Sequence, residues 1–267
     1  METKLNYKRT FLIGLAFLSI CSFWQMYDNI IPLILQNTYH LGETMTGAVM
    51  ALDNVLAIFL LPVFGTLSDK VHTKLGRRMP FIVSGTILAV IFMMLLPMID
   101  NAEKARWGTV ESFSNQVIFL AVLFFTLVSM GLYRSPAVAL MPDVTPNHLR
   151  SRANAVINLM GAVGGVYALI MIKVLVGKGE TPDYLPLFAS IAAVMAIAVG
   201  ILVMTIRENK LREEVEKAEA AIAETIEEKA MAEGVEAVGE IEAVGDTGAV
   251  KASDGKKQTG KTEGTKG

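Results

Sequence analysis

The sequence predicts an all-α membrane protein with six transmembrane helices and with both chain termini in the cytoplasm. The chain of 267 residues is 52% hydrophobic and only 19% charged, below the roughly 25% charge of an ordinary soluble domain. Six apolar runs each reach the length of about 20 residues that a bilayer-spanning helix needs. A soluble protein of this length would lack the polar surface to cover such a core, so we expect the runs to lie in lipid.

The six predicted spans fill most of the first 206 residues, which we expect to form one transmembrane domain. In chain order they are 11–36, 44–64, 80–98, 115–140, 152–176 and 184–206. The apolar part of the first run exceeds the roughly 7–15 residues of a signal peptide, so we expect it to remain as a helix. Gly65, Gly161 and Gly165 are expected to let neighbouring helices approach closely.

Basic residues gather in alternate loops, and this sets the predicted orientation. The first, third and fifth polar segments contain Lys4, Lys8, Arg9, Lys70, Lys74, Arg77, Arg78, Arg150 and Arg152. The loops between them have no Lys or Arg, or balance them with acids. Because cytoplasmic loops are rich in Lys and Arg, we expect a multi-pass protein of the plasma (cytoplasmic) membrane, with these segments inside the cell.

The last 61 residues differ from the rest, because they contain 15 acidic and 10 basic side chains. Residues 207–233 are predicted to form a charged cytoplasmic helix with an apolar stripe of Leu211, Val215, Ile222 and Ile226. Residues 234–267 are rich in Gly, Glu, Lys and Thr, and we expect them to be disordered.

Several functions are disfavoured by the sequence. Cys21 is the single cysteine, and no Cys/His cluster suggests a metal site. No nucleophile–base pair, phosphate-binding glycine loop or nucleic-acid patch is apparent, so we expect neither an enzyme nor a nucleic-acid-binding protein. No cofactor is predicted, apart from a coupling cation, H⁺ or Na⁺.

Two acids lie inside predicted spans, where an Asp costs about 2.5–3.5 kcal/mol and usually faces water or a partner. Asp28 and Asp53 lie about 12 and 13.5 Å from the same membrane face at 1.5 Å per residue. If they share a cavity, their mutual repulsion favours binding of a cation. We expect them to act in cation coupling, sugar recognition or both; the alternative is local pairing with Asn29, Asn54, Tyr27 or the backbone.

Aromatic and basic residues accompany these acids. Trp24, Tyr27 and Tyr133 could stack on a sugar ring, or they could simply pack within the bundle. Arg134 lies in the fourth run, towards its cytoplasmic end. It could close a gate with Asp69 or Asp143, or extend to the membrane surface.

Two stretches resemble a known family. The sequence "GTLSDK" followed by "GRR" is similar to the loop signature of the major facilitator superfamily between helices 2 and 3. The intervening "VHTKL" resembles the wider spacing of the glycoside–pentoside–hexuronide:cation symporters and the sucrose:proton symporters. Residues 133–165, "YRSPAVALMPDVTPNHLRSRANAVINLMGAVGG", resemble the helix 4–helix 5 signature of the same group.

The resemblance implies roles for the charged loops. Asp69 would pair with Arg77 and Arg78 in one conformation and separate from them in the other, which makes a gate. Asp143, Arg150 and Arg152 would form a second such set, which could pair with the first loop. The alternative is that the bases only fix the topology.

The resemblance also implies sugar or glycoside symport with H⁺ or Na⁺ by alternating access. The superfamily has twelve helices in two six-helix halves with the substrate between them, so we expect this chain to act as an N-terminal half with a second half or as a homodimer. The alternative is a truncated or non-transporting membrane subunit with a regulatory or assembly role.

Overall fold

The computed structural model describes residues 5–71, 73–106, 113–177 and 182–232, and these residues are helical almost throughout. In chain order the α-helices are α1 (Tyr7–Asn37), α2 (Glu43–Lys70), α3 (Met79–Lys104), α4 (Phe113–Asp143), α5 (Arg150–Leu175), α6 (Leu185–Thr205) and α7 (Glu208–Ala232). The chain divides into two units, Met1–Ala223 and Glu224–Gly267. The predicted disordered tail, 234–267, lies outside the described residues.

Six of the described helices, α1 to α6, are long and apolar enough to cross a membrane. This confirms the predicted all-α fold with six spans. The helices extend past the predicted apolar runs, because polar turns continue them: α2 runs to Lys70 and α3 to Lys104. Both helices end on a lysine, whose charge is favourable near a helix C-terminus.

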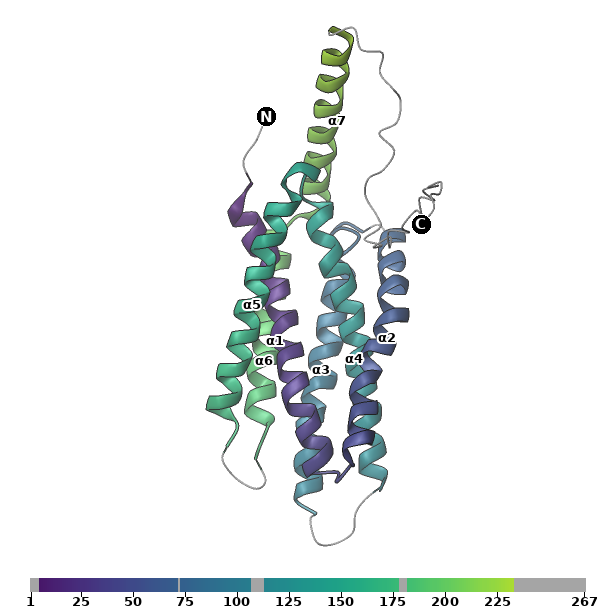
Figure 1. The fold of residues 1–267 in the computed structure, drawn as a ribbon, viewed down its shortest axis with the longest axis vertical. Helices are drawn as coiled ribbons and strands as arrows, with labels where there is room; N and C mark the ends of the chain where they lie inside the picture. Colours follow the sequence, from purple (N-terminus) through teal and green to yellow (C-terminus); the bar gives the residue numbers. More distant parts are fainter. Residues whose placement is uncertain (1–4, 72, 107–112, 178–181, 233–267) are drawn as a thin grey trace, which may run out of the picture. The chain divides into compact units, whose positions relative to one another are not determined.

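The six long helices run alternately up and down within the first unit (Figure 1). The beginning of α1, the α2–α3 and α4–α5 connections and the beginning of α7 lie at one end, which we call the basic end. The ends of α1, α3 and α5 and the beginnings of α2, α4 and α6 lie at the opposite end. This alternation is what consecutive spans require, and it brings the predicted cytoplasmic segments together.

Small residues let α1 and α5 pack closely. A Cβ atom on Gly164 would collide with the Leu18 carbonyl oxygen, and one on Gly161 would lie 2.9 Å from Cys21 Sγ. The Ser22 hydroxyl donates to the carbonyl oxygens of Leu18, at 2.8 Å, and of Gly164, at 2.9 Å. Gly164 therefore lies at the closest approach of the two helices.

The other two predicted packing glycines are less crowded. A Cβ atom on Gly165 would lie 3.7 Å from Gln25 Oε1, which is an ordinary contact. One on Gly65 would lie 3.3 Å from Ser135 Oγ, where α2 meets α4. Of the glycines predicted for packing, Gly161 is thus the one at a tight contact between α1 and α5.

Gly164→Ala is expected to lower the free energy of unfolding by about 1–3 kcal/mol, because overpacking forces the α1 and α5 backbones apart. The matched control is Gly165→Ala, one residue along the same helix, which should change stability by less than about 0.5 kcal/mol. Unfolding of the detergent-solubilised chain, followed by tryptophan fluorescence, measures both. Equal losses for the two variants would contradict the assigned contact.

Candidate functional site

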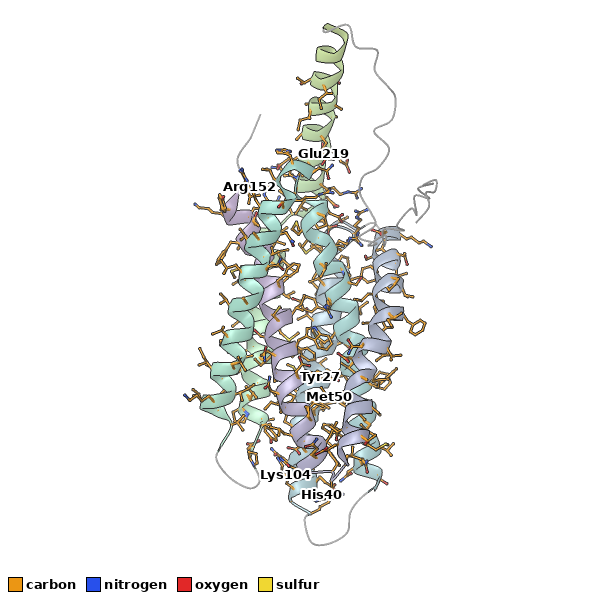
Figure 2. All side chains as sticks on the ribbon, in the orientation of Figure 1. Tyr27, His40, Met50, Lys104, Arg152 and Glu219 are labelled. Carbon is orange, nitrogen blue, oxygen red and sulfur yellow. The ribbon has the colours of Figure 1, made fainter. Side chains whose placement is uncertain are left out.

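The middle of α1 presents aromatic and acidic side chains, and Tyr27 lies between the two ends of the bundle (Figure 2). The Tyr27 side chain is 1% exposed, and its ring meets that of Trp24 edge-on, with centroids 5.4 Å apart. Among the described residues, neither the Tyr27 hydroxyl nor Trp24 Nε1 has a hydrogen-bond partner. Buried polar groups are nearly always hydrogen-bonded, so these two donors are available to a ligand or to water.

The two predicted acids differ in their surroundings. Asp53 in α2 accepts hydrogen bonds from the backbone N–H of Asn54, at 2.7 Å, and from Asn54 Nδ2, at 3.0 Å. Asp28 in α1 is exposed on the bundle surface and makes no such contact in the described part of the chain. The local pairing considered for both acids therefore applies to Asp53 and not to Asp28.

Arg134 lies near Asp53 and Trp24. Its guanidinium carbon is 5.4 Å from the centre of the Trp24 ring, a distance typical of a cation–π contact. Trp24, Asp53 and Arg134 together line a narrow cavity of about 20 Å³ between α1, α2 and α4. Among the described residues, Arg134 makes no ion pair with Asp69 or Asp143, and the gate predicted for it stays a prediction.

Tyr133 is a packing residue in this structure. Its side chain is fully buried, and its hydroxyl pairs with Ser19 Oγ at 2.6 Å and donates to the Ala16 carbonyl at 3.0 Å. These bonds tie α4 to α1. Tyr133 is therefore not available to stack on a ligand, in contrast to Trp24.

The mid-bundle site consists of Trp24, Tyr27, Asp28, Asp53 and Arg134. It combines two carboxylates, one guanidinium and two donors that have no hydrogen-bond partner among the described residues. All of these groups lie inside the spans α1, α2 and α4. Charged groups at that depth are expensive and usually serve a substrate or ion pathway. The arrangement can bind a polar ligand by hydrogen bonds and an aromatic face, and it can exchange a cation at a carboxylate.

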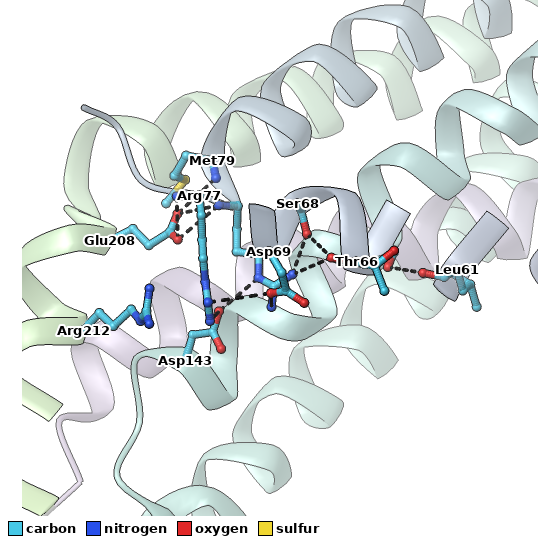
Figure 3. A network of polar contacts seen from close by, with 12 residues as sticks. Leu61, Thr66, Ser68, Asp69, Arg77, Met79, Asp143, Glu208 and Arg212 are labelled. Carbon is cyan, nitrogen blue, oxygen red and sulfur yellow. Dashed lines mark hydrogen bonds and ion pairs between the residues drawn. The ribbon is translucent and has the colours of Figure 1, made fainter. Parts of the chain in front are cut away.

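A second set of charges lies at the basic end (Figure 3). Arg78 forms ion pairs with Asp69 of α2, at 2.5 Å, and with Asp143 of α4, at 3.0 Å. Arg77 pairs with Asp143 at 2.9 Å and with Asp69 at 3.7 Å. We call these four residues the charge cluster; it joins the ends of α2 and α4 through the residues that precede α3.

Arg78 is the central member of the charge cluster. Its side chain is only 6% exposed, while that of Asp69 is 48% exposed. Its Nη1 donates to the Gly65 carbonyl at 3.2 Å and to the Ser68 hydroxyl. Because guanidinium has five donors in a fixed plane, these bonds fix the geometry in a way that lysine could not.

Glu208, the first residue of α7, was not predicted to belong to a site. Its carboxylate accepts the backbone N–H groups of Arg77 at 2.9 Å, Arg78 at 3.0 Å and Met79 at 3.1 Å. The first N–H groups of a helix lack partners inside it, and α3 has no capping side chain of its own. Glu208 therefore caps α3 from outside, where a negative charge also favours the helix dipole.

The loop before α3 is shaped to admit this carboxylate. Gly76 has φ +123°, and a Cβ atom there would collide with the Glu208 side chain. The Asn209 amide donates to the carbonyls of Thr73, at 3.0 Å, and Lys74, at 3.3 Å. The beginning of α7 is thus bound to the α2–α3 loop on both sides of Gly76.

Glu208→Ala is expected to lower the free energy of unfolding by about 1–2 kcal/mol, the upper range for the loss of a helix cap. Glu216→Ala is the control, because Glu216 is an exposed α7 acid whose pair with Arg212 is worth at most about 1 kcal/mol. Thermal unfolding in detergent compares the variants. An equal shift for both would contradict the capping role.

The second predicted set, Asp143 with Arg150 and Arg152, is not assembled as expected. Arg150 donates to the carbonyls of Thr145, at 3.2 Å, and Pro142, at 3.0 Å, so it caps the end of α4. Arg152 lies exposed on α5 and makes no ion pair among the described residues. Asp143 pairs with Arg77 and Arg78 of the first loop, which is the pairing that was considered for this set, and so belongs to the charge cluster.

The sequence profile of the Major Facilitator Superfamily matches residues 13–245, which is most of the chain. The chain belongs to this superfamily. The six long apolar helices indicate a multi-pass membrane protein. The family match indicates a transporter family and not an enzyme family.

Several curated superfamily proteins are similar to part of this chain. "Sucrose transport protein SUT3" of Oryza sativa subsp. japonica is 26% identical over 137 residues, 48% of this chain and 27% of that protein. "Sucrose transport protein SUC4" of Arabidopsis thaliana is 34% identical over 116 residues, 41% of this chain and 22% of that protein. An uncharacterized symporter of Synechocystis is 24% identical over 144 residues, 52% of this chain and 25% of that protein. The chain spans about a quarter of the length of these relatives.

Proposed function

We propose that this chain is one half of a secondary transporter that moves a sugar or glycoside together with H⁺ or Na⁺. The observation that carries the proposal is Asp28, a carboxylate exposed in the middle of a span without a partner in the described structure. The names of the similar proteins, sucrose transport proteins and a symporter, support this class of substrate and coupling. The basic end is then the cytoplasmic end.

The mid-bundle site is the proposed place of substrate recognition. The Trp24 indole N–H and the Tyr27 hydroxyl have no hydrogen-bond partner in the described parts of the chain, and the donors and acceptors of a sugar could satisfy both. The Trp24 face is shared with Arg134 at present, and a sugar ring would compete for it. Carboxylates such as Asp28 accept hydrogen bonds from sugar hydroxyls, and these charged bonds are stronger than neutral ones.

Asp28 and Asp53 are the proposed cation-binding groups. Two carboxylates at similar depth in the consecutive spans α1 and α2 favour binding of a proton or a metal cation, because this removes their repulsion. Arg134 lines the same narrow cavity as Asp53, so a small movement would let the guanidinium replace the bound cation. Substrate binding and cation binding would be coupled if the substrate moved the Arg134 guanidinium away from Trp24 and towards Asp53.

The charge cluster is the proposed gate at the basic end. Asp69 lies half exposed on one side of the buried Arg78, and Asp143 lies on the other. The contact with the exposed partner is the cheaper of the two to break, because water can replace it. Separation of Asp69 from Arg78 would free the end of α2, as alternating access requires.

A second six-helix bundle is the proposed partner. The apolar side chains of α2 and α5 are widely exposed in the first unit, among them Ile58 at 70%, Phe59 at 66% and Leu159 at 64%. The polar groups Asp28 of α1 and Asn54 of α2 are also exposed within spans, and lipid would not solvate them. A second bundle, or a second copy of the chain, would enclose these groups in a water-accessible path.

Reconstitution into lipid vesicles tests this function. The chain is inserted alone, or with the second half of a sucrose transport protein, and uptake of labelled sucrose is measured under an imposed H⁺ or Na⁺ gradient. Uptake that follows one gradient in either arrangement is the expected result, and the effective gradient identifies the cation. No uptake in any arrangement, with correctly inserted protein, would instead favour a non-transporting membrane subunit.

A further inference from the structure

A buried cluster of polar groups lies at the end of the bundle opposite the charge cluster, near the labelled Lys104 (Figure 2). Asp100 in the last turns of α3 is 0% exposed. It accepts a hydrogen bond from Thr38 Oγ1, at 2.7 Å, and pairs with Lys104 Nζ at 2.6 Å. Thr38 is the residue that ends α1, so this carboxylate joins the end of α1 to α3.

Lys104 extends the same cluster to α6. Its ammonium group donates to the Pro182 carbonyl, at 2.6 Å, and lies 4.4 Å from the centre of the Tyr184 ring. Burial, and to a smaller extent the Asp100 charge, raise the pKa of the Tyr184 hydroxyl. The ring therefore stays neutral and attracts the cation through its face.

A separate hydrogen bond also joins the end of α3 to the beginning of α6. Asn101 Nδ2 donates to Asp183 Oδ1 at 2.7 Å, and the same oxygen accepts the backbone N–H of Leu185 in the first turn of α6. The end of α3 is thus bonded to the beginning of α6 at two places and to the end of α1 at one. We call Thr38, Asp100, Lys104, Pro182 and Tyr184 the end clamp.

The helical hydrogen-bond ladder of α1 is interrupted between the end clamp and the mid-bundle site. Pro32 lies inside α1 and has no N–H group. The carbonyl of Asp28, four residues earlier, therefore lacks the donor that a regular helix provides. Bends in helices concentrate at such positions, and this one directly follows Trp24, Tyr27 and Asp28.

We propose that the end clamp holds residues 33–38 of α1 fixed against α3 and α6, and that the site-bearing part of α1 moves by bending at Pro32. The clamp is suited to this task because a buried ion pair resists loss of either partner. Asp100, Lys104 and Thr38 are then positioning residues. They set the fixed point from which the mid-bundle site is displaced, and they touch no substrate themselves.

Distances between spin labels test this proposal without relying on transport. In a Cys21→Ser background, one label pair is placed at exposed positions near the clamp, Gln36→Cys and Met98→Cys. A second pair is placed towards the basic end, Phe11→Cys and Ser84→Cys. The clamp pair is expected to give a narrow distance distribution, and the second pair a broader one, because α1 moves only beyond Pro32.

Two changes then separate the clamp from general stability. Thr38→Val keeps the shape of the side chain but removes the bond to Asp100, and Asp100→Leu with Lys104→Met removes both charges together. Either change is expected to broaden the distribution of the clamp pair to that of the second pair. Pro32→Ala is expected to narrow the second pair, because it restores the helical donor to Asp28.

The chain offers a matched control. Glu213 and Lys217 form an i,i+4 ion pair of the same 2.6 Å length on the exposed surface of α7. Glu213→Leu with Lys217→Met should leave both distributions unchanged. A clamp pair that stays narrow in Thr38→Val and in the double variant, or a second pair unaffected by Pro32→Ala, would overturn the proposal. Neither result would bear on sugar transport.

Discussion

Asp28→Asn is expected to reduce gradient-driven uptake of labelled sucrose by at least about tenfold, the factor that 1.4 kcal/mol represents. The change removes the charge proposed to bind the cation and would weaken the proposed hydrogen bonds to the substrate. Hydrogen bonds to charged groups contribute about 1.5–3 kcal/mol. Exchange of labelled for unlabelled sucrose, without a cation gradient, separates the two effects. Exchange persists if Asp28 serves coupling alone, and it is lost if Asp28 also binds sugar.

Asp53→Asn serves as the internal comparison. Its carboxylate already accepts two hydrogen bonds from Asn54, and an amide oxygen can accept the same bonds. We therefore expect a smaller loss of uptake than for Asp28→Asn. Undiminished uptake in both variants, unaffected by the cation gradient, would exclude these acids from coupling.

Arg78→Ala is expected to lower the free energy of unfolding by about 3 kcal/mol, because it removes two ion pairs and the hydrogen bonds that a buried guanidinium makes to Gly65 and Ser68. For a chain of this size, that corresponds to a fall of about 6–12 °C in melting temperature. The variant leaves Asp143, at 15% exposure, with Arg77 as its remaining partner. Thermal unfolding in detergent gives the shift directly.

Arg152→Ala is the control for Arg78→Ala. Both residues are arginines at the basic end, but Arg152 is exposed on α5 and makes no ion pair in the described chain. Its removal should change stability by no more than about 0.5 kcal/mol. Similar shifts for the two arginines would mean that general basicity, and not the charge cluster, stabilises this end.

The six spans were predictable because the length of an apolar run is a local property. Pro80 and Pro186 in the first turns of α3 and α6 add a local signal for where those helices begin. The charged loop also predicted a pairing of Asp69 with Arg77 and Arg78, and the structure brings these residues together with Asp143. Whether they open and close a gate stays a prediction.

Other contacts depend on how distant segments dock, and no local pattern reveals them. Glu208 is 130 residues from the Arg78 backbone that it caps. One signal could have suggested it: α3 begins without Ser, Thr, Asp or Asn at its cap, so its first N–H groups need an external acceptor. The burial of Asp100 was equally hard to predict from the sequence, because a charged residue near the end of a span is usually solvated. In the structure, α1 and α6 bury it.

The shortest span limits how the protein fits its lipid. α6 has 21 residues, about 31 Å at 1.5 Å per residue, barely more than the hydrocarbon thickness of about 30 Å. α1 has 31 residues and reaches about 46 Å by the same measure. A thicker bilayer therefore strains α6 before α1. Glu208 follows the end of α6 by three residues and is hydrogen-bonded to the first turn of α3. The acyl-chain length of the lipid would therefore change the position of α6 along the membrane normal relative to α3.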